Sequence, residues 1–141
     1  MRFIYLFCVF ISIHSFSAHA VLGEKFTDSA KYSATSLNSL TKYESAEDKL
    51  TLHQFSAAGG KVFAVAWQGK QHPDLRQLLG TQFANFEKAL MAARKIRRGH
   101  APIEINEAGL HVELGGSSRA MYGRVWINGQ LPAGVDTNDI H

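Results

Sequence analysis

One segment with helical periodicity lies between two groups of segments whose apolar residues alternate with polar ones. Within residues 81–98, apolar side chains recur at intervals of three and four residues, which places them on one stripe of a helix: Phe83, Phe86, Leu90 and Ala93. The segments on either side show the period of two that is typical of strands half buried in a sheet. This arrangement predicts an α+β fold, with an antiparallel sheet that packs one face against a single main helix.

Three strands are expected before the helix, and together they predict an antiparallel meander. They cover Leu40–Glu44, Leu50–Phe55 and Lys61–Trp67, with turns at residues 45–48 and 57–60. The third strand is almost wholly apolar, which is typical of a central strand that is covered on both faces.

The boundaries of the helical region are marked by residues that begin or end helices. Pro73 and Asp74 predict a short helical turn, because proline is tolerated in the first turn of a helix, and Gly80 ends it. Thr81 is the expected N-cap of the main helix. Basic residues crowd the last turn of that helix, where cations meet the negative end of the helix dipole, and Gly99 follows as the capping residue.

After the helix, the period of two returns. Residues 103–105 and 110–114 predict a hairpin, residues 115–118 a glycine- and serine-rich loop, and Ala120–Ile127 a last strand. Along that last strand, alternate side chains face opposite sides of the sheet. One side carries Tyr122, Arg124 and Trp126.

The two ends of the domain are less regular. Val21–Leu37 is expected to be an irregular lead-in with at most one short strand, and the residues from Pro132 to His141 a polar tail. The sheet is therefore expected to contain five to six strands, in the order β-β-β-α-β-β-β, within one domain over residues 21–141.

The first twenty residues have the three-part pattern of a secretory signal peptide. Arg2 supplies the positive charge, residues 3–13 form an apolar run, and Ala18 and Ala20 are the small residues before the cleavage site. The apolar run is shorter than the about 20 residues that span a membrane as a helix. We therefore expect cleavage after Ala20 and a periplasmic or secreted protein. Its interior would contain no thiol, because Cys8 leaves with the leader.

Two segments carry a resemblance to a known family. One runs from His53 through the string Val62–Gly69 to Pro73–Gly80, and the other runs from Arg119 to Val135. Together with the leader, they resemble a small family of exported bacterial proteins catalogued as domain of unknown function 2844. The resemblance covers essentially the whole mature chain. It implies export and an intact fold, and because the family has no assigned activity, it implies no catalytic residue.

The motifs of common catalytic and metal sites fail on spacing or context. None of the five histidines after the leader has a partner histidine two to four residues away, and no cysteine is left to bind a metal. Gly115–Arg119 begins like the serine elbow of hydrolases, but a strand follows it where the elbow needs a helix. No catalytic residue, metal or cofactor is therefore predicted, and whether the protein is an enzyme stays open, with a non-enzymatic protein favoured.

Binding is the favoured function, and three groups of residues are its candidates. Trp67, Gln68, His72 and Asp74 combine an aromatic ring with polar neighbours, Arg97 and Arg98 are basic residues at the helix end, and Arg119 lies in the second glycine-rich segment. The main hypothesis is an accessory or binding protein of the cell envelope. The alternatives are an enzyme that uses His72, Asp74 and Arg119, and a module that contacts anionic lipid or glycan through the basic helix end. Nucleic acid is not an expected partner, because the net charge is only +3 and the protein is exported.

Overall fold

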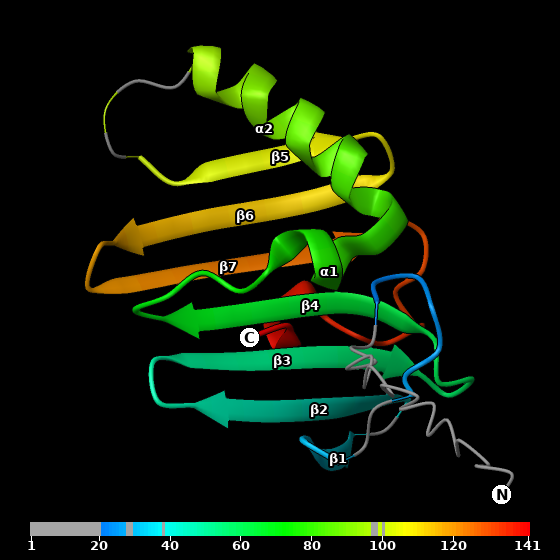
Figure 1. The fold of residues 1–141 in the computed structure, drawn as a ribbon. Coiled ribbons are helices and arrows are strands. Elements are labelled where there is room, and N and C mark those ends of the chain that lie inside the picture. Colours follow the sequence, from blue (N-terminus) through cyan, green and yellow to red (C-terminus); the bar gives the residue numbers. More distant parts are fainter. Residues whose placement is uncertain (1–20, 28–29, 38, 97–98, 100) are drawn as a thin grey trace, which may run out of the picture.

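A seven-stranded antiparallel sheet is the framework of the protein (Figure 1). The computed structural model describes residues 21–27, 30–37, 39–96, 99 and 101–141. The predicted signal peptide, together with Arg97 and Arg98, lies outside the described residues. The strands are β1 (Ser33–Leu37), β2 (Leu40–Glu47), β3 (Leu50–Ala57), β4 (Val62–Gly69), β5 (Ile103–Glu107), β6 (Leu110–Ser117) and β7 (Ala120–Ile127).

The strand order in space is β1-β2-β3-β4-β7-β6-β5. The first four strands form a meander, after which the chain crosses one face of the sheet as the helices α1 (Leu75–Leu79) and α2 (Phe83–Ile96), joined by the 3₁₀ turn η1 (Gly80–Gln82). It then enters the opposite edge as β5 and returns inward, so that β7 pairs with β4. The α+β architecture with one main helix is confirmed, and the central strand is formed as predicted.

The prediction of five to six strands was wrong, because its count did not include the short strand that the lead-in could contain, which is β1. This edge strand pairs with β2, but all five of its residues are exposed. A strand with no buried face has no alternation of apolar and polar residues, so the period of two cannot reveal it.

Two of the predicted turns are parts of strands. Residues 45–47 continue β2 and pair with residues 50–52, which leaves Asp48 and Lys49 as the turn. Likewise, Gly115 and Gly116 continue β6 and pair with Tyr122 and Met121 of β7. In both cases the polar or glycine-rich composition favours a loop locally, but the ladder of hydrogen bonds from a neighbouring strand outweighs that preference.

The predicted helix is present, with a shifted start. Residues 80–82 form the 3₁₀ turn η1, so α2 begins at Phe83 and Thr81 is not its N-cap. Of the predicted stripe, Phe86 is buried, and the other members pack against the helix-side core as partly buried side chains. Asp74 is the N-cap of α1, because its Oδ1 accepts a hydrogen bond from the main-chain N–H of Gln77 at 3.0 Å.

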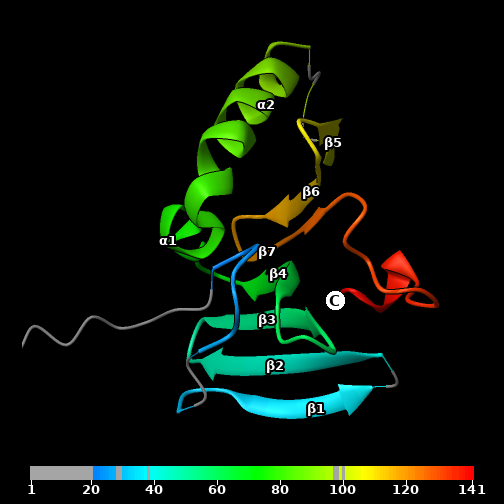
Figure 2. The ribbon, with the colours of Figure 1, turned by 90° about the vertical axis from the view of Figure 1, so that its right-hand side faces the viewer.

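Each face of the sheet has its own core, and Figure 2 shows the sheet between the two layers. The helices cover one face, where Leu22 of the lead-in, Trp67, Leu79 and Phe86 are buried. On the other face, the C-terminal segment Gln130–His141, with the 3₁₀ turn η2 (Thr137–Asp139), packs over β3, β4 and β7. The side chain of Ile140 is completely buried there, although the tail is mostly polar in sequence. Within the described residues, no helix is both long enough and apolar enough to cross a membrane.

Candidate functional site

A hollow opens on the face of the sheet opposite the helices, over the middle of β4. Its volume is about 370 Å³, within the range of roughly 300–1,000 Å³ that is typical of small-molecule sites. Ala66 lines it together with polar and apolar residues of four strands and the C-terminal segment: His53, Trp67, Gln68, Glu113, Tyr122, Gly123, Arg124, Ile140 and His141. We call this hollow the Ala66 cavity.

The register of four strands places the cavity. His53 of β3 pairs with Ala66 of β4, Ala66 pairs with Arg124 of β7, and Arg124 pairs with Glu113 of β6. Directly paired residues point to the same side of an antiparallel sheet, so these four side chains form a row across it. Ala66 has by far the smallest side chain of the row, and the hollow lies above it.

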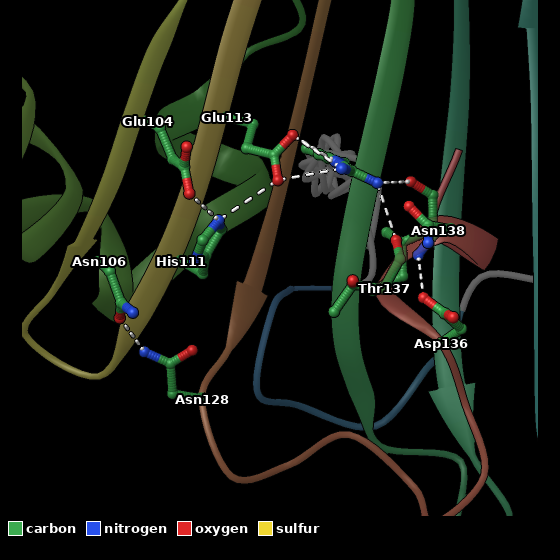
Figure 3. A network of polar contacts seen from close by, with 10 residues as sticks. Glu104, Asn106, His111, Glu113, Asn128, Asp136, Thr137 and Asn138 are labelled. Carbon is green, nitrogen blue, oxygen red and sulfur yellow. Dashed lines mark hydrogen bonds and ion pairs between the residues drawn. The ribbon is translucent and has the colours of Figure 1, made fainter.

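Arg124 holds the C-terminal segment against the sheet. Its Nε donates a hydrogen bond to Oε2 of Glu113 at 2.8 Å, and its Nη2 donates to Oε1 at 3.0 Å, which is a bidentate ion pair. Its Nη1 donates to the main-chain oxygens of Thr137 at 2.8 Å and Ile140 at 3.4 Å. Figure 3 shows Glu113 and Thr137 on opposite sides of this network. The charge of Arg124 is thus neutralised by Glu113, and the guanidinium fixes one wall of the cavity.

Glu104 of β5 pairs with Glu113 and continues the polar row to the edge of the sheet, and His111 of β6 lies beside both carboxylates (Figure 3). Its Nε2 lies 3.3 Å from Oε1 of Glu113 and 3.6 Å from Oε1 of Glu104. The imidazole stacks on the indole of Trp126, with ring centroids 4.1 Å apart. In the part of the chain that the structure describes, no group of three or more histidine, cysteine, aspartate or glutamate side chains is arranged to hold a metal ion.

His53 connects β3 to the last residue of the C-terminal segment. Its Nδ1 lies 2.7 Å from the main-chain oxygen of His141, and its Nε2 lies 3.0 Å from Oε2 of Glu44. Burial lowers the pKa of His53 below its ordinary value, and the positive charge of Lys42 lowers it further, although the contacts with His141 and Glu44 act in the opposite direction. The imidazole is therefore neutral at pH 7, with one N–H group to donate to one of the two oxygens.

This lowered pKa predicts that the protein loses stability in mild acid. Below about pH 6.5, the unfolded state binds a proton at His53 more readily than the folded state, so protonation favours unfolding. The contribution of His53 is fully present above pH 6.5 and declines as the pH falls toward the folded-state pKa. Chemical denaturation between pH 5 and 8 should show a smaller decline for His53→Gln than for the wild type. The exposed His72 provides the matched control: His72→Gln should keep the wild-type pH profile, and identical profiles for all three proteins would contradict the assignment.

A second hollow adjoins the Ala66 cavity at the end of the sheet. Its volume is about 440 Å³, and we call it the end cavity. Gln68 and Tyr122 line both hollows. The charged residues of the end cavity have mixed signs: Glu47, Asp48, Lys49, Lys70 and Arg119. The two hollows therefore adjoin at Gln68 and Tyr122, and we call the pair of them the groove.

The structure brings only some of the predicted binding residues together. Gln68 and Arg119 both line the end cavity, whereas Asp74 lines a separate hollow beside α1 and His72 is exposed in the loop between β4 and α1. Trp67 lines the Ala66 cavity beside Gln68, but it is 3% exposed and belongs to the helix-side core, so its indole ring is not available to a ligand. The proposed enzyme trio of His72, Asp74 and Arg119 is thus spread over different parts of the surface, and Arg97 and Arg98 lie outside the described residues.

The sequence interpretation missed most of the residues that line the Ala66 cavity. His53, Glu113 and His141 were not selected as binding residues, and Arg124 and Tyr122, which share a face of the last strand, were not selected either, because burial was favoured for the aromatic residues of that face. The alternating pattern could have pointed to Glu113 and Arg124, because both are polar residues on strands whose neighbouring residues are apolar. What the pattern lacks is the pairing of β4 with β7, which joins two parts of the sheet that are more than fifty residues apart in sequence.

A family model described as "Protein of unknown function (DUF2844)" matches residues 18–140. No curated protein and no solved structure matches the chain.

Proposed function

The chain belongs to the DUF2844 family of proteins of unknown function, and from this premise we propose that it is an exported, non-enzymatic protein that binds a small polar ligand in the Ala66 cavity. The observation that carries this proposal is the convergence of His53, Gln68, Tyr122 and Arg124 on one hollow of about 370 Å³. Sites for small molecules typically combine such a hollow with a few well-placed polar groups.

The arrangement of the polar groups favours binding over catalysis. Arg124 and Glu113 are engaged with one another and with the C-terminal segment, and both ring nitrogens of His53 face oxygen atoms of the protein. Groups held in this way form a rigid, preorganised wall, which lowers the entropic cost of binding. General acid–base catalysis would instead need a titratable group free to contact the reacting atoms.

Export is supported by the leader and by the extent of the family match. The positive charge at Arg2, the apolar run and the small residues at 18 and 20 fit the sequence pattern of a signal peptide. The family match begins at residue 18, so the charged and apolar parts of the leader lie before it. The cell envelope is the compartment in which we propose that the ligand is met.

Two measurements test the two parts of the proposal. The protein is recovered from the periplasm of its expression host by osmotic shock, and its mass is expected to correspond to residues 21–141. NMR spectra recorded with the small-molecule fraction of a bacterial envelope extract should show shifts at Ala66, Gln68 and Gly123. The variant Ala66→Leu, whose larger side chain occupies the hollow, should lose these shifts and keep its fold.

Two outcomes would contradict the proposal. A mass that still includes residues 1–20 would exclude cleavage of the leader. Shifts that are the same in Ala66→Leu as in the wild type would exclude the Ala66 cavity as the binding site. Leu37→Ser is the matched control, because Leu37 is exposed on the edge strand β1, away from the cavity.

A further inference from the structure

We infer that the ligand is a glycan chain, one sugar ring of which stacks on Tyr122 in the groove. This inference rests on the proposed function and specifies the class of ligand. It follows from three features of the groove. The ring of Tyr122 is exposed and packs against the main chain, the side-chain amide of Gln68 beside it makes no hydrogen bond within the described residues, and both residues line two adjoining hollows.

The ring of Tyr122 packs against Gly115, a residue without a side chain. Tyr122 pairs with Gly115 across β6 and β7, and a Cβ built on Gly115 would overlap the hydroxyl oxygen of Tyr122 and lie 2.5 Å from its Cζ. The ring therefore rests directly on the main chain of Gly115. Because 45% of Tyr122 is nevertheless exposed, the side of the ring that faces away from Gly115 is open to a ligand. Such an exposed aromatic face suits the C–H-rich face of a sugar ring.

Gln68 supplies the polar partner for the sugar hydroxyls. It is the residue of β4 that pairs with Tyr122, and its side chain is exposed. Within the described part of the chain, neither Gln68 nor Tyr122 uses its side chain in a hydrogen bond. A primary amide offers both donors and an acceptor, so it can pair with two neighbouring hydroxyl groups, each of which both donates and accepts.

The charge distribution favours an uncharged, hydroxyl-rich ligand over an anionic one. In the Ala66 cavity, the charge of Arg124 is balanced by Glu113 at hydrogen-bond distance. In the end cavity, three basic residues stand beside two acidic ones, Glu47 and Asp48. Neither hollow is lined by charges of one sign, which is the arrangement that attracts and concentrates charged ligands.

The shape of the groove favours a chain of sugars over a peptide. Gln68 and Tyr122 lie where the two hollows meet, so a ligand stacked on Tyr122 extends into both. The groove lies on the face of the sheet, and β4 and β7 already pair with strands on both sides. An extended peptide would gain its affinity from a free strand edge, and these strands offer none.

The test measures binding of three uncharged oligosaccharides, hexa-N-acetylchitohexaose, cellohexaose and maltohexaose, to the mature protein by isothermal titration calorimetry. We expect at least one of them to bind with a stoichiometry of one. Tyr122→Ala should weaken that binding by about tenfold or more, because the stacking surface is lost. Tyr122→Phe keeps the ring and should stay near the wild-type affinity. Met91→Ser, which removes an exposed apolar side chain of α2, is the control.

Gly115 is a positioning residue in this site, and it has a test of its own. Its backbone φ is outside the left-handed region, so Gly115→Ala changes the support of Tyr122 without backbone strain. Gly115→Ala should weaken oligosaccharide binding in the wild type and have no further effect in the Tyr122→Ala background. A general structural effect would weaken binding equally in both backgrounds.

The outcomes separate this inference from the proposed function. If none of the three oligosaccharides binds, or if Tyr122→Ala binds as well as the wild type, the glycan assignment is wrong. Binding of a glycine-serine hexapeptide in their place would make the ligand a peptide. In each of these cases, shifts caused by the envelope extract and abolished by Ala66→Leu would still uphold the binding function of the cavity.

Discussion

Replacing Gly123 with alanine should lower the free energy of unfolding by about 3 kcal/mol, the upper part of the range for overpacking a filled core. Gly123 lies in the middle of β7, between Trp67 of β4 and Leu114 of β6. A Cβ at this position would overlap two ring carbons of Trp67 and lie 2.8 Å from Cδ2 of Leu114. Because the Trp67 ring is buried in the helix-side core, it cannot move aside without displacing other core residues.

The matched control for this prediction is another glycine. Gly59 lies in the turn between β3 and β4, where a Cβ would meet no atom within 4 Å, and its φ is not in the left-handed region. Gly59→Ala should therefore leave stability unchanged within about 0.5 kcal/mol, as is usual for surface substitutions. Urea denaturation of both variants measures the difference. Equal stability of Gly123→Ala and Gly59→Ala would show that the indole has room to move.

The second large effect is expected at Arg124. Replacing Arg124 with methionine should lower the free energy of unfolding by about 2–3 kcal/mol, because Glu113 and two main-chain oxygens then lose charged hydrogen-bond donors. The estimate lies below the value for a fully buried ion pair, since the side chains of Arg124 and Glu113 are 23% and 27% exposed. Methionine keeps much of the length and apolar contact of the arginine stem, so the measured loss reports mainly on the guanidinium.

The C-terminal segment should separate from the sheet before the rest of the Arg124→Met variant unfolds. Thr137 and Ile140 lose the contacts that Arg124 makes with their main-chain oxygens. Hydrogen exchange should therefore accelerate in residues 130–141, while the main chain of β4 remains protected. Arg119→Met is the control, because Arg119 is exposed in the turn between β6 and β7. A stability for Arg124→Met equal to that of Arg119→Met would mean that the segment is held without the contacts of Arg124.

The alternation of apolar and polar residues, and for β4 an almost wholly apolar run, located six of the seven strands, because each of those strands buries at least one face. The helix was found for the same reason, since its Phe83 and Phe86 contact the core. Strand β1 could not be located in this way, because both of its faces are exposed. The burial of Ile140 could not be predicted either, because a single apolar residue in a polar tail forms no periodic pattern.

The candidate site could be predicted only in fragments. Gln68 was selected because it follows an apolar strand and stands beside an aromatic residue, and it does line the groove. Its neighbour Trp67 was selected for its ring, which points to the other face of the sheet because adjacent strand residues alternate. Arg119 was placed with His72 and Asp74, whereas it shares the end cavity with Gln68.

The local pattern of the chain determined which segments form strands and helix, and which neighbouring strands form hairpins, because both depend on interactions between residues close in sequence. The tertiary structure alone decided that β4 lies beside β7 and that the C-terminal segment covers the second face. Side-chain periodicity specifies the face that a residue occupies, but it does not specify which distant strand lies beside it. The row of His53, Ala66, Arg124 and Glu113, and with it the cavity, exists only once those distant strands have packed together.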